Sequence, residues 1–202
     1  MSRLTLLLAA GAATLALGGC MSMNGGGSMN SDMGGSATSS GASSNPTVGG
    51  AAMYANRNIV ENAMNSPIHR TLVAAVQQAQ LVDTLSGPGP FTVFAPTDQA
   101  FDRVPAAARA SLMQDANRAQ LQGVLTYHVV PGRVTAAELM RRIQAGGGRA
   151  TLTTVAGGTL TASMMGDRVM LTDARGGMSH VTTADVMQSN GVIHVVDAVL
   201  MP

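Results

Sequence analysis

The stretch that most constrains the fold is residues 91–101, which read FTVFAPTDQAF. Its first residues are mostly β-formers in a strand-like alternation, and Pro96 ends the strand because proline has no N–H to donate to a ladder. Thr97 and Asp98 follow, and either side-chain oxygen could accept from the free N–H groups of a helix beginning at Gln99. The sequence therefore predicts a buried strand that turns sharply into a capped helix.

Two further blocks follow this corner in the sequence. Residues 125–134 read LTYHVVPGRV, and residues 189–202 read SNGVIHVVDAVLMP. Together with FTVFAPT and the Ala-Phe pair after it, these ordered blocks resemble the fasciclin (FAS1) domain family over residues 54–202, with 146–178 the least typical part. The resemblance implies a single domain of the α+β class, with a β-core of mostly C-terminal strands and several short helices packed on it.

Local patterns give the expected elements. Glu61 lies three residues after Asn58, and Glu138 three residues after Thr135, so each pair predicts a capping box at a helix start, while Pro67 suits the first position of a further helix. Helices are expected at 59–64, from 67 onward, 105–114, 116–125 and 136–143, and strands at 127–130, 150–155, 159–164, 168–172, 180–184 and 192–200.

The N-terminus has the features of an export signal. Residues 1–19 combine Arg3 with an apolar run that is too short to span a bilayer. The run ends in Leu-Gly-Gly-Cys, which resembles a bacterial lipobox and implies cleavage before Cys20 and acylation of that residue. An ordinary secretory cleavage near Gly19 is the alternative. Met21, rather than Asp, after Cys20 favours the outer membrane in a cell with two membranes.

Residues 20–51 are rich in Gly and Ser, and this composition predicts a flexible tether between the lipidated cysteine and a domain at 52–202. Four methionines lie in the tether: Met21, Met23, Met29 and Met33. Thioethers suit Cu(I), so copper binding is one interpretation of these residues. The other, which we favour, is that methionine is a neutral filler, since the spacing is irregular.

Charge and composition exclude some partners. Twelve basic residues, all Arg, nearly balance eleven acidic ones, and they form no cationic stripe. With no Trp, two Tyr and three Phe, the chain also lacks a platform for stacking bases. Nucleic acid is therefore not expected as a partner.

No catalytic motif or metal-ligand spacing is found, and the four histidines are scattered. We therefore expect no enzyme activity, no cofactor and no metal site. His194 and Asp197 lie on an apolar strand, on opposite faces, where an unpartnered polar group costs about 1–3 kcal/mol. Both are interpreted as hydrogen-bonded fold determinants rather than functional groups.

Tyr127 and His128 form the last pair of interest. On a strand, adjacent residues face opposite ways, so they would not form one site without a bulge or a strand end. In the fasciclin family this dipeptide is associated with cell adhesion, including integrin binding in animal members. We favour a role in packing, and a contact site remains the alternative.

The sequence thus predicts an exported, lipid-anchored envelope protein whose fasciclin domain mediates non-enzymatic adhesion or binding to an unknown protein or matrix component. The alternative is an envelope protein that handles a small ligand or a metal such as copper.

Overall fold

The computed structural model describes residues 45–202. The predicted signal peptide, Cys20, the tether up to residue 44 and the methionines Met21, Met23, Met29 and Met33 lie outside the described residues. Within 45–202, no helix is both long enough and apolar enough to cross a bilayer.

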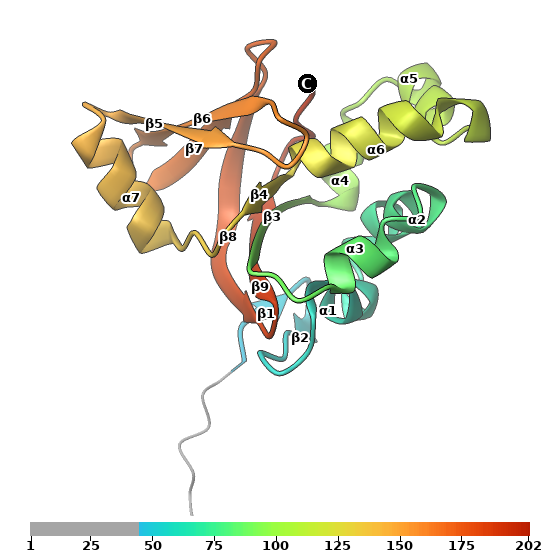
Figure 1. Ribbon diagram of the computed structural model, residues 1–202, viewed down its shortest axis with the longest axis horizontal. Coiled ribbons are helices and arrows are strands. Elements are labelled where there is room, and N and C mark those ends of the chain that lie inside the picture. The colour runs from blue at the N-terminus through green and yellow to red at the C-terminus, as the bar shows by residue number, and fades with distance from the viewer. Residues whose placement is uncertain (1–44) are drawn as a thin grey trace, which may run out of the picture. The chain divides into compact units, whose positions relative to one another are not determined.

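A seven-stranded sheet, in the order β4-β3-β9-β8-β7-β6-β5, forms the framework (Figure 1). The strands β3 and β9 pair in parallel, and all other neighbours are antiparallel. The strand β8 pairs with β7 through residues 178–180 and with β9 from Val181 onward, so it links the two halves of the sheet. The strands are β3 Phe91–Pro96, β4 Val129–Pro131, β5 Arg149–Thr153, β6 Thr159–Met165, β7 Arg168–Thr172, β8 Met178–Gln188 and β9 Gly191–Val196.

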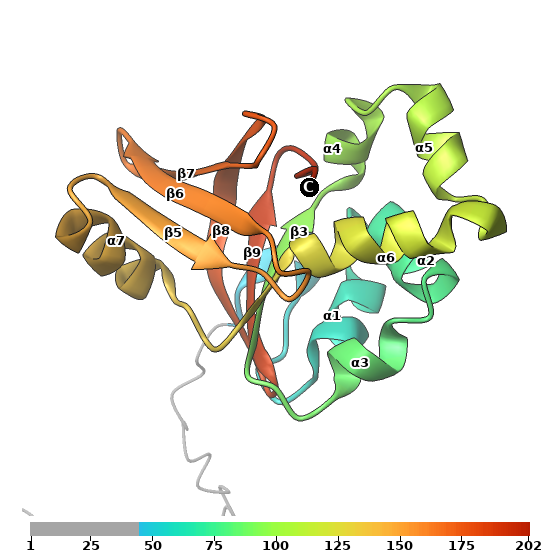
Figure 2. The ribbon, with the colours of Figure 1, turned by 45° about the horizontal axis from the view of Figure 1, so that its top comes forward.

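The helices lie in two groups (Figures 1 and 2). The helices α1 to α6 gather beside β3 and β9, whereas α7 lies against β5, β6 and β7. Their bounds are α1 Ile59–Asn65, α2 Arg70–Gln78, α3 Val82–Ser86, α4 Asp98–Asp102, α5 Ala106–Leu112, the 3-10 turn η1 Asp115–Asn117, α6 Arg118–Tyr127 and α7 Ala136–Ala145.

Two apolar clusters follow from this arrangement. One joins α1, α2, α3 and α6 to β3 and β9, and the other joins α7 to the inner faces of β5 to β8. Sequence reasoning predicted the α+β class, the single domain and the β-core, and the structure confirms all three. The capping box at Asn58 is also confirmed, because its side chain accepts from Glu61 N while the Glu61 side chain accepts from Asn58 N.

The ordered fold begins earlier than the predicted boundary at residue 52. A hairpin of β1 (Thr47–Val48) and β2 (Ala51–Ala52) precedes it, and Met53 N donates to Pro46 O at 2.9 Å. Val48 is only 4% exposed because it packs in the cluster of α1 and α2. Because Val48 is a single apolar residue beside a Gly- and Ser-rich stretch, sequence reasoning assigned it to the tether. The predicted end of the tether, residue 51, was therefore about five residues too late.

Three element boundaries also differ from the prediction. Tyr127 is the last residue of α6 rather than the start of a strand, and β4 begins only at Val129. Pro67 lies in a turn, and α2 starts three residues later at Arg70. The strand β9 ends at Val196, where its pairing with β8 ends.

Candidate functional site

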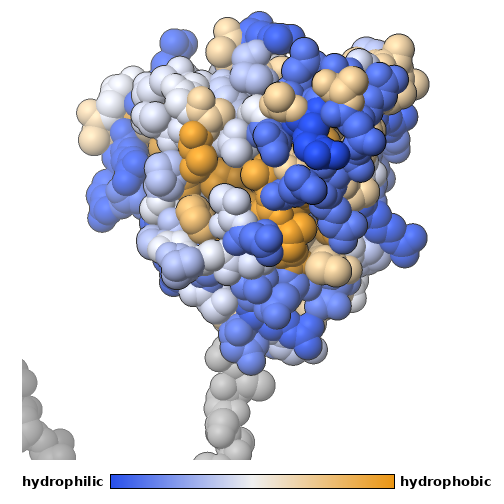
Figure 3. All heavy atoms as spheres, turned by 45° about the vertical axis from the view of Figure 1, so that its right-hand side comes forward, coloured by the Kyte–Doolittle hydropathy of each residue, from blue (hydrophilic) through white to orange (hydrophobic). Residues whose placement is uncertain are grey.

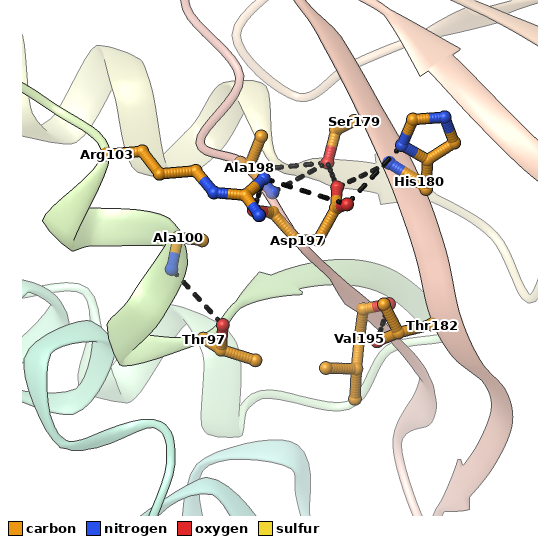
Figure 4. A network of polar contacts seen from close by, with 9 residues as sticks. All are labelled: Thr97, Ala100, Arg103, Ser179, His180, Thr182, Val195, Asp197 and Ala198. Atoms are coloured by element: carbon orange, nitrogen blue, oxygen red, sulfur yellow. Dashed lines mark hydrogen bonds and ion pairs between the residues drawn. The ribbon is translucent and has the colours of Figure 1, made fainter.

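The corner after β3 holds two helix starts together. Thr97 caps α4, since its Oγ1 accepts from Ala100 N at 3.2 Å (Figure 4). Asp98 has a different partner: its Oδ1 accepts from Thr71 N at 2.8 Å, in the first turn of α2. His69, the residue at the N-cap position of α2, makes no capping bond with its side chain, so Asp98 supplies that cap from 27 positions away in the sequence. The corner therefore fastens α2 to α4.

Replacing Thr97 and Asp98 with Ala is expected to lower the free energy of unfolding by roughly 1–2 kcal/mol, because one cap is lost from each of two helices. Chemical denaturation of the double variant measures this loss. Asp98→Asn is the matched control, since its amide oxygen can still accept from Thr71 N. An unchanged midpoint in the double variant would mean that other contacts hold the corner.

Tyr127 is fully buried at the end of α6. Its hydroxyl donates to Thr159 O at 2.7 Å and accepts from Ala174 N at 3.0 Å, and burial raises the pKa of this phenol. A Cβ added at Gly158 would lie 2.5 Å from the Tyr127 ring, so glycine leaves the space that the ring occupies. Tyr127 thus joins the end of α6 to the first residue of β6 and to the loop after β7.

His128 is the C-cap residue of α6 and is 2% exposed. Its Nδ1 lies 2.8 Å from Val124 O, and its Nε2 accepts from Leu200 N at 3.0 Å. This pattern requires the hydrogen on Nδ1 and a neutral ring. Burial lowers the pKa of His128 to about 4. Both ring nitrogens are therefore occupied in linking α6 to the C-terminal segment.

His194 is likewise buried, in the middle of β9. Its Nε2 lies 2.8 Å from Val134 O, its Nδ1 accepts from Asp185 N at 3.3 Å, and its ring stacks on Phe94 at 5.6 Å between centroids. Burial lowers its pKa. Every polar atom of this imidazole has a partner inside the protein.

Asp197 lies one residue past the end of β9, so it is beside the sheet rather than on an apolar strand face as predicted. Its Oδ1 accepts from His180 N at 2.7 Å and from Ser179 Oγ at 3.5 Å, and its Oδ2 lies 3.4 Å from His180 Nδ1 (Figure 4). Arg103 Nη1 donates to Asp197 O at 3.0 Å. Asp197 therefore anchors the start of β8 to the end of β9.

An apolar slot opens beside His128, between α1, α2, α3 and the signature strand β3. It has a volume of about 40 Å³, and residues that line it include Val60, Val73, Val82, Leu85, Val93 and His128. A second apolar cavity of about 20 Å³ shares Leu125 and His128 with the slot. Figure 3, which views the molecule from the side of these helices, shows a hydrophobic band bordered by hydrophilic residues. Sequence reasoning missed the slot, because its walls come from segments up to 70 residues apart.

The polar residues do not form one site. Tyr127 and His128 face the core, Thr97 and Asp98 hold the helix corner, and Asp197 lies at the far end of β9. Among residues 45–202, no three His, Cys, Asp or Glu side chains lie close enough together to hold a metal ion. These polar side chains thus make hydrogen bonds within the protein, and the apolar slot lies beside His128.

The sequence of the chain is similar to those of several known proteins. The chain is 44% identical over 152 residues to protein sll1483 of Synechocystis sp.. The aligned region covers 75% of this chain and 77% of sll1483. It is 34% identical over 167 residues to the cell surface glycolipoprotein MPB83 of Mycobacterium bovis, covering 80% of this chain and 68% of that one.

Among solved structures, a FAS1 domain pair from the insect cell adhesion molecule Fasciclin I superposes with a TM-score of 0.65 at 19% identity. The match covers 72% of this chain and 51% of that two-domain chain, and at this identity it shows the fold alone. The fasciclin domain family matches residues 67–202, which include all three sequence blocks. The chain therefore belongs to the fasciclin (FAS1) family.

Proposed function

We propose that this chain is an exported, lipid-anchored, non-enzymatic protein that binds a protein or matrix component at the cell surface. One relative supports the proposal: MPB83 is named a cell surface glycolipoprotein. The carrying observation is that Tyr127 and His128 are buried and hydrogen-bonded within the domain. Their burial supports a packing role for the dipeptide and a contact surface elsewhere on the domain.

The apolar slot is the surface that fits this role best. Among the residues that line it, Val73 on α2 and Val82 on α3 are half-buried valines. Pockets for small ligands usually measure roughly 300–1,000 Å³. A slot of about 40 Å³ is far smaller, so it fits one inserted aliphatic side chain of a partner better than a separate small molecule.

Replacing Val73 and Val82 with Asp is expected to reduce capture of envelope or matrix components by at least tenfold, because the charges would be desolvated on contact. The measurement is adhesion per folded molecule, with thermal unfolding followed on the same preparations. The matched control is Met140→Asp, which places a charge at a 39% exposed apolar position on α7, away from the slot. Equal binding by the slot variant and the wild type would exclude this surface.

The anchor is tested separately. Cys20→Ala is expected to move the protein from the membrane fraction to the soluble fraction, because acyl chains contribute about 0.8 kcal/mol per buried methylene. Detergent phase partitioning measures the change, and mass spectrometry of the wild-type N-terminus provides the control. A Cys20→Ala protein that still partitions with detergent would refute acylation at this residue.

A further inference from the structure

One row of side chains crosses the outer face of the sheet, the face turned away from α7. Register places Ser163 of β6 opposite Met170 of β7, and Met170 opposite His180 of β8. Asp197 continues the row after β9 through its contacts with His180. Met178 precedes His180 by two residues on the same strand and so lies on the same face.

Met170 and Met178 share this face with a third methionine, Met165, at the end of β6. Most of the positions around them are hydroxyl residues, as expected for the solvated side of an antiparallel sheet: Thr151, Thr161, Ser163, Thr172 and Thr182. Met178 is nevertheless 61% exposed, and Met170 is partly exposed. Residues directly opposite have Cβ atoms about 5 Å apart, and diagonal neighbours are about 7–8 Å apart, within reach of long side chains. Met170 therefore lies directly opposite His180, and Met178 lies two residues before His180 on the same face.

The imidazole of His180 is oriented for binding. Its Nδ1 lies 3.4 Å from Asp197 Oδ2, so this edge of the ring faces the carboxylate. Nε2 lies on the other edge and makes no hydrogen bond or ion pair within the described part of the chain. Figure 4 shows this second nitrogen on the side of the ring away from Asp197, with Arg103 approaching Asp197 from the opposite direction. A carboxylate that orients a ligating histidine in this way is a common arrangement in metal sites.

We propose that Met170, Met178 and His180 bind one Cu(I) ion, with Asp197 as a positioning residue. Thioether sulfurs are soft ligands that select Cu(I), and imidazole also binds copper. Two sulfurs and one nitrogen give a three-coordinate site at the surface. This site is independent of the surface proposed for adhesion and of the methionines in the predicted tether.

The test is a titration of the full chain with Cu(I) under ascorbate, in competition with a chromogenic Cu(I) chelator. One equivalent is expected to bind, with X-ray absorption showing two sulfur scatterers and one nitrogen. Met170→Leu with Met178→Leu should weaken binding by at least 100-fold, and Asp197→Asn by about 10–100-fold. Both changes preserve side-chain shape, and thermal unfolding checks that each variant is folded.

Two controls separate this site from other methionines. Met64→Leu removes a 59% exposed thioether on α1, outside this face of the sheet, and should leave the affinity unchanged. Changing Met21, Met23, Met29 and Met33 to Ser should also leave one Cu(I) bound. The proposal would be overturned if the tether variant no longer binds the one Cu(I) ion, if Met64→Leu weakens binding as much as the double Leu variant, or if the wild type does not bind Cu(I) against the chelator.

Discussion

Acidification from pH 7 to pH 4 is expected to destabilise the domain by about 3 kcal/mol through His128 alone. The pKa of His128 falls from 6.5 to about 4 on folding, because the ring is buried. Between these two values the unfolded chain binds a proton that the folded chain does not, so stability falls as pH decreases. This contribution is fully present above about pH 6.5 and is lost as the pH approaches 4. His69 and His194 also have lowered pKa values from burial and act in the same direction.

Urea denaturation at several pH values between 7.5 and 4 measures this slope. His128→Gln is the matched variant, because it removes the titrating ring while keeping polar atoms near Val124 O and Leu200 N. Its stability should be lower than that of the wild type at pH 7 and should depend less on pH. A wild-type free energy of unfolding that stays constant from pH 7 to pH 4.5 would contradict a neutral, buried His128.

His128→Ala is expected to cost about 2–4 kcal/mol at neutral pH. The change leaves the buried Leu200 N without its acceptor and Val124 O without its side-chain donor, and it also opens a cavity next to the apolar slot. For a domain of this size the melting temperature should fall by roughly 5–15 °C. Any loss of adhesion should then follow the loss of folded protein.

Tyr127→Phe is the control for this prediction, since it removes the bonds to Thr159 O and Ala174 N while keeping the buried ring. It should destabilise the domain by less than His128→Ala does. The decisive measurement is adhesion per folded molecule, with unfolding and surface abundance determined on the same variants. A His128→Ala protein that melts at the wild-type temperature and fails to bind would make the dipeptide a contact site.

The features predicted correctly from the sequence are those with local causes. The strand before Pro96 and the capping box of Asn58 and Glu61 depend on neighbours within a few residues. Asp98 shows the limit of this reasoning. Nothing near it in the sequence indicates that its partner is Thr71 N, because that contact exists only once α2 and α4 are packed.

Tyr127 was misassigned for a related reason. Its aromatic side chain favours a strand locally, but the helix continues because the ring is held in the core by Thr159 O and Ala174 N. The slot and the row of Met170, His180 and Asp197 could not be predicted either, since each is assembled from several strands or helices. A strand register is needed before such residues can be recognised as neighbours.

The parallel pairing of β3 with β9 has a consequence for how the protein is made. Phe91 pairs with Gly191, so the first signature strand lacks its central neighbour until the ribosome has added 100 more residues. Such distant pairing slows folding, because a large loop must close before the contacts form. A chain synthesised from its N-terminus thus stays unable to complete its sheet until almost all of it has been translated.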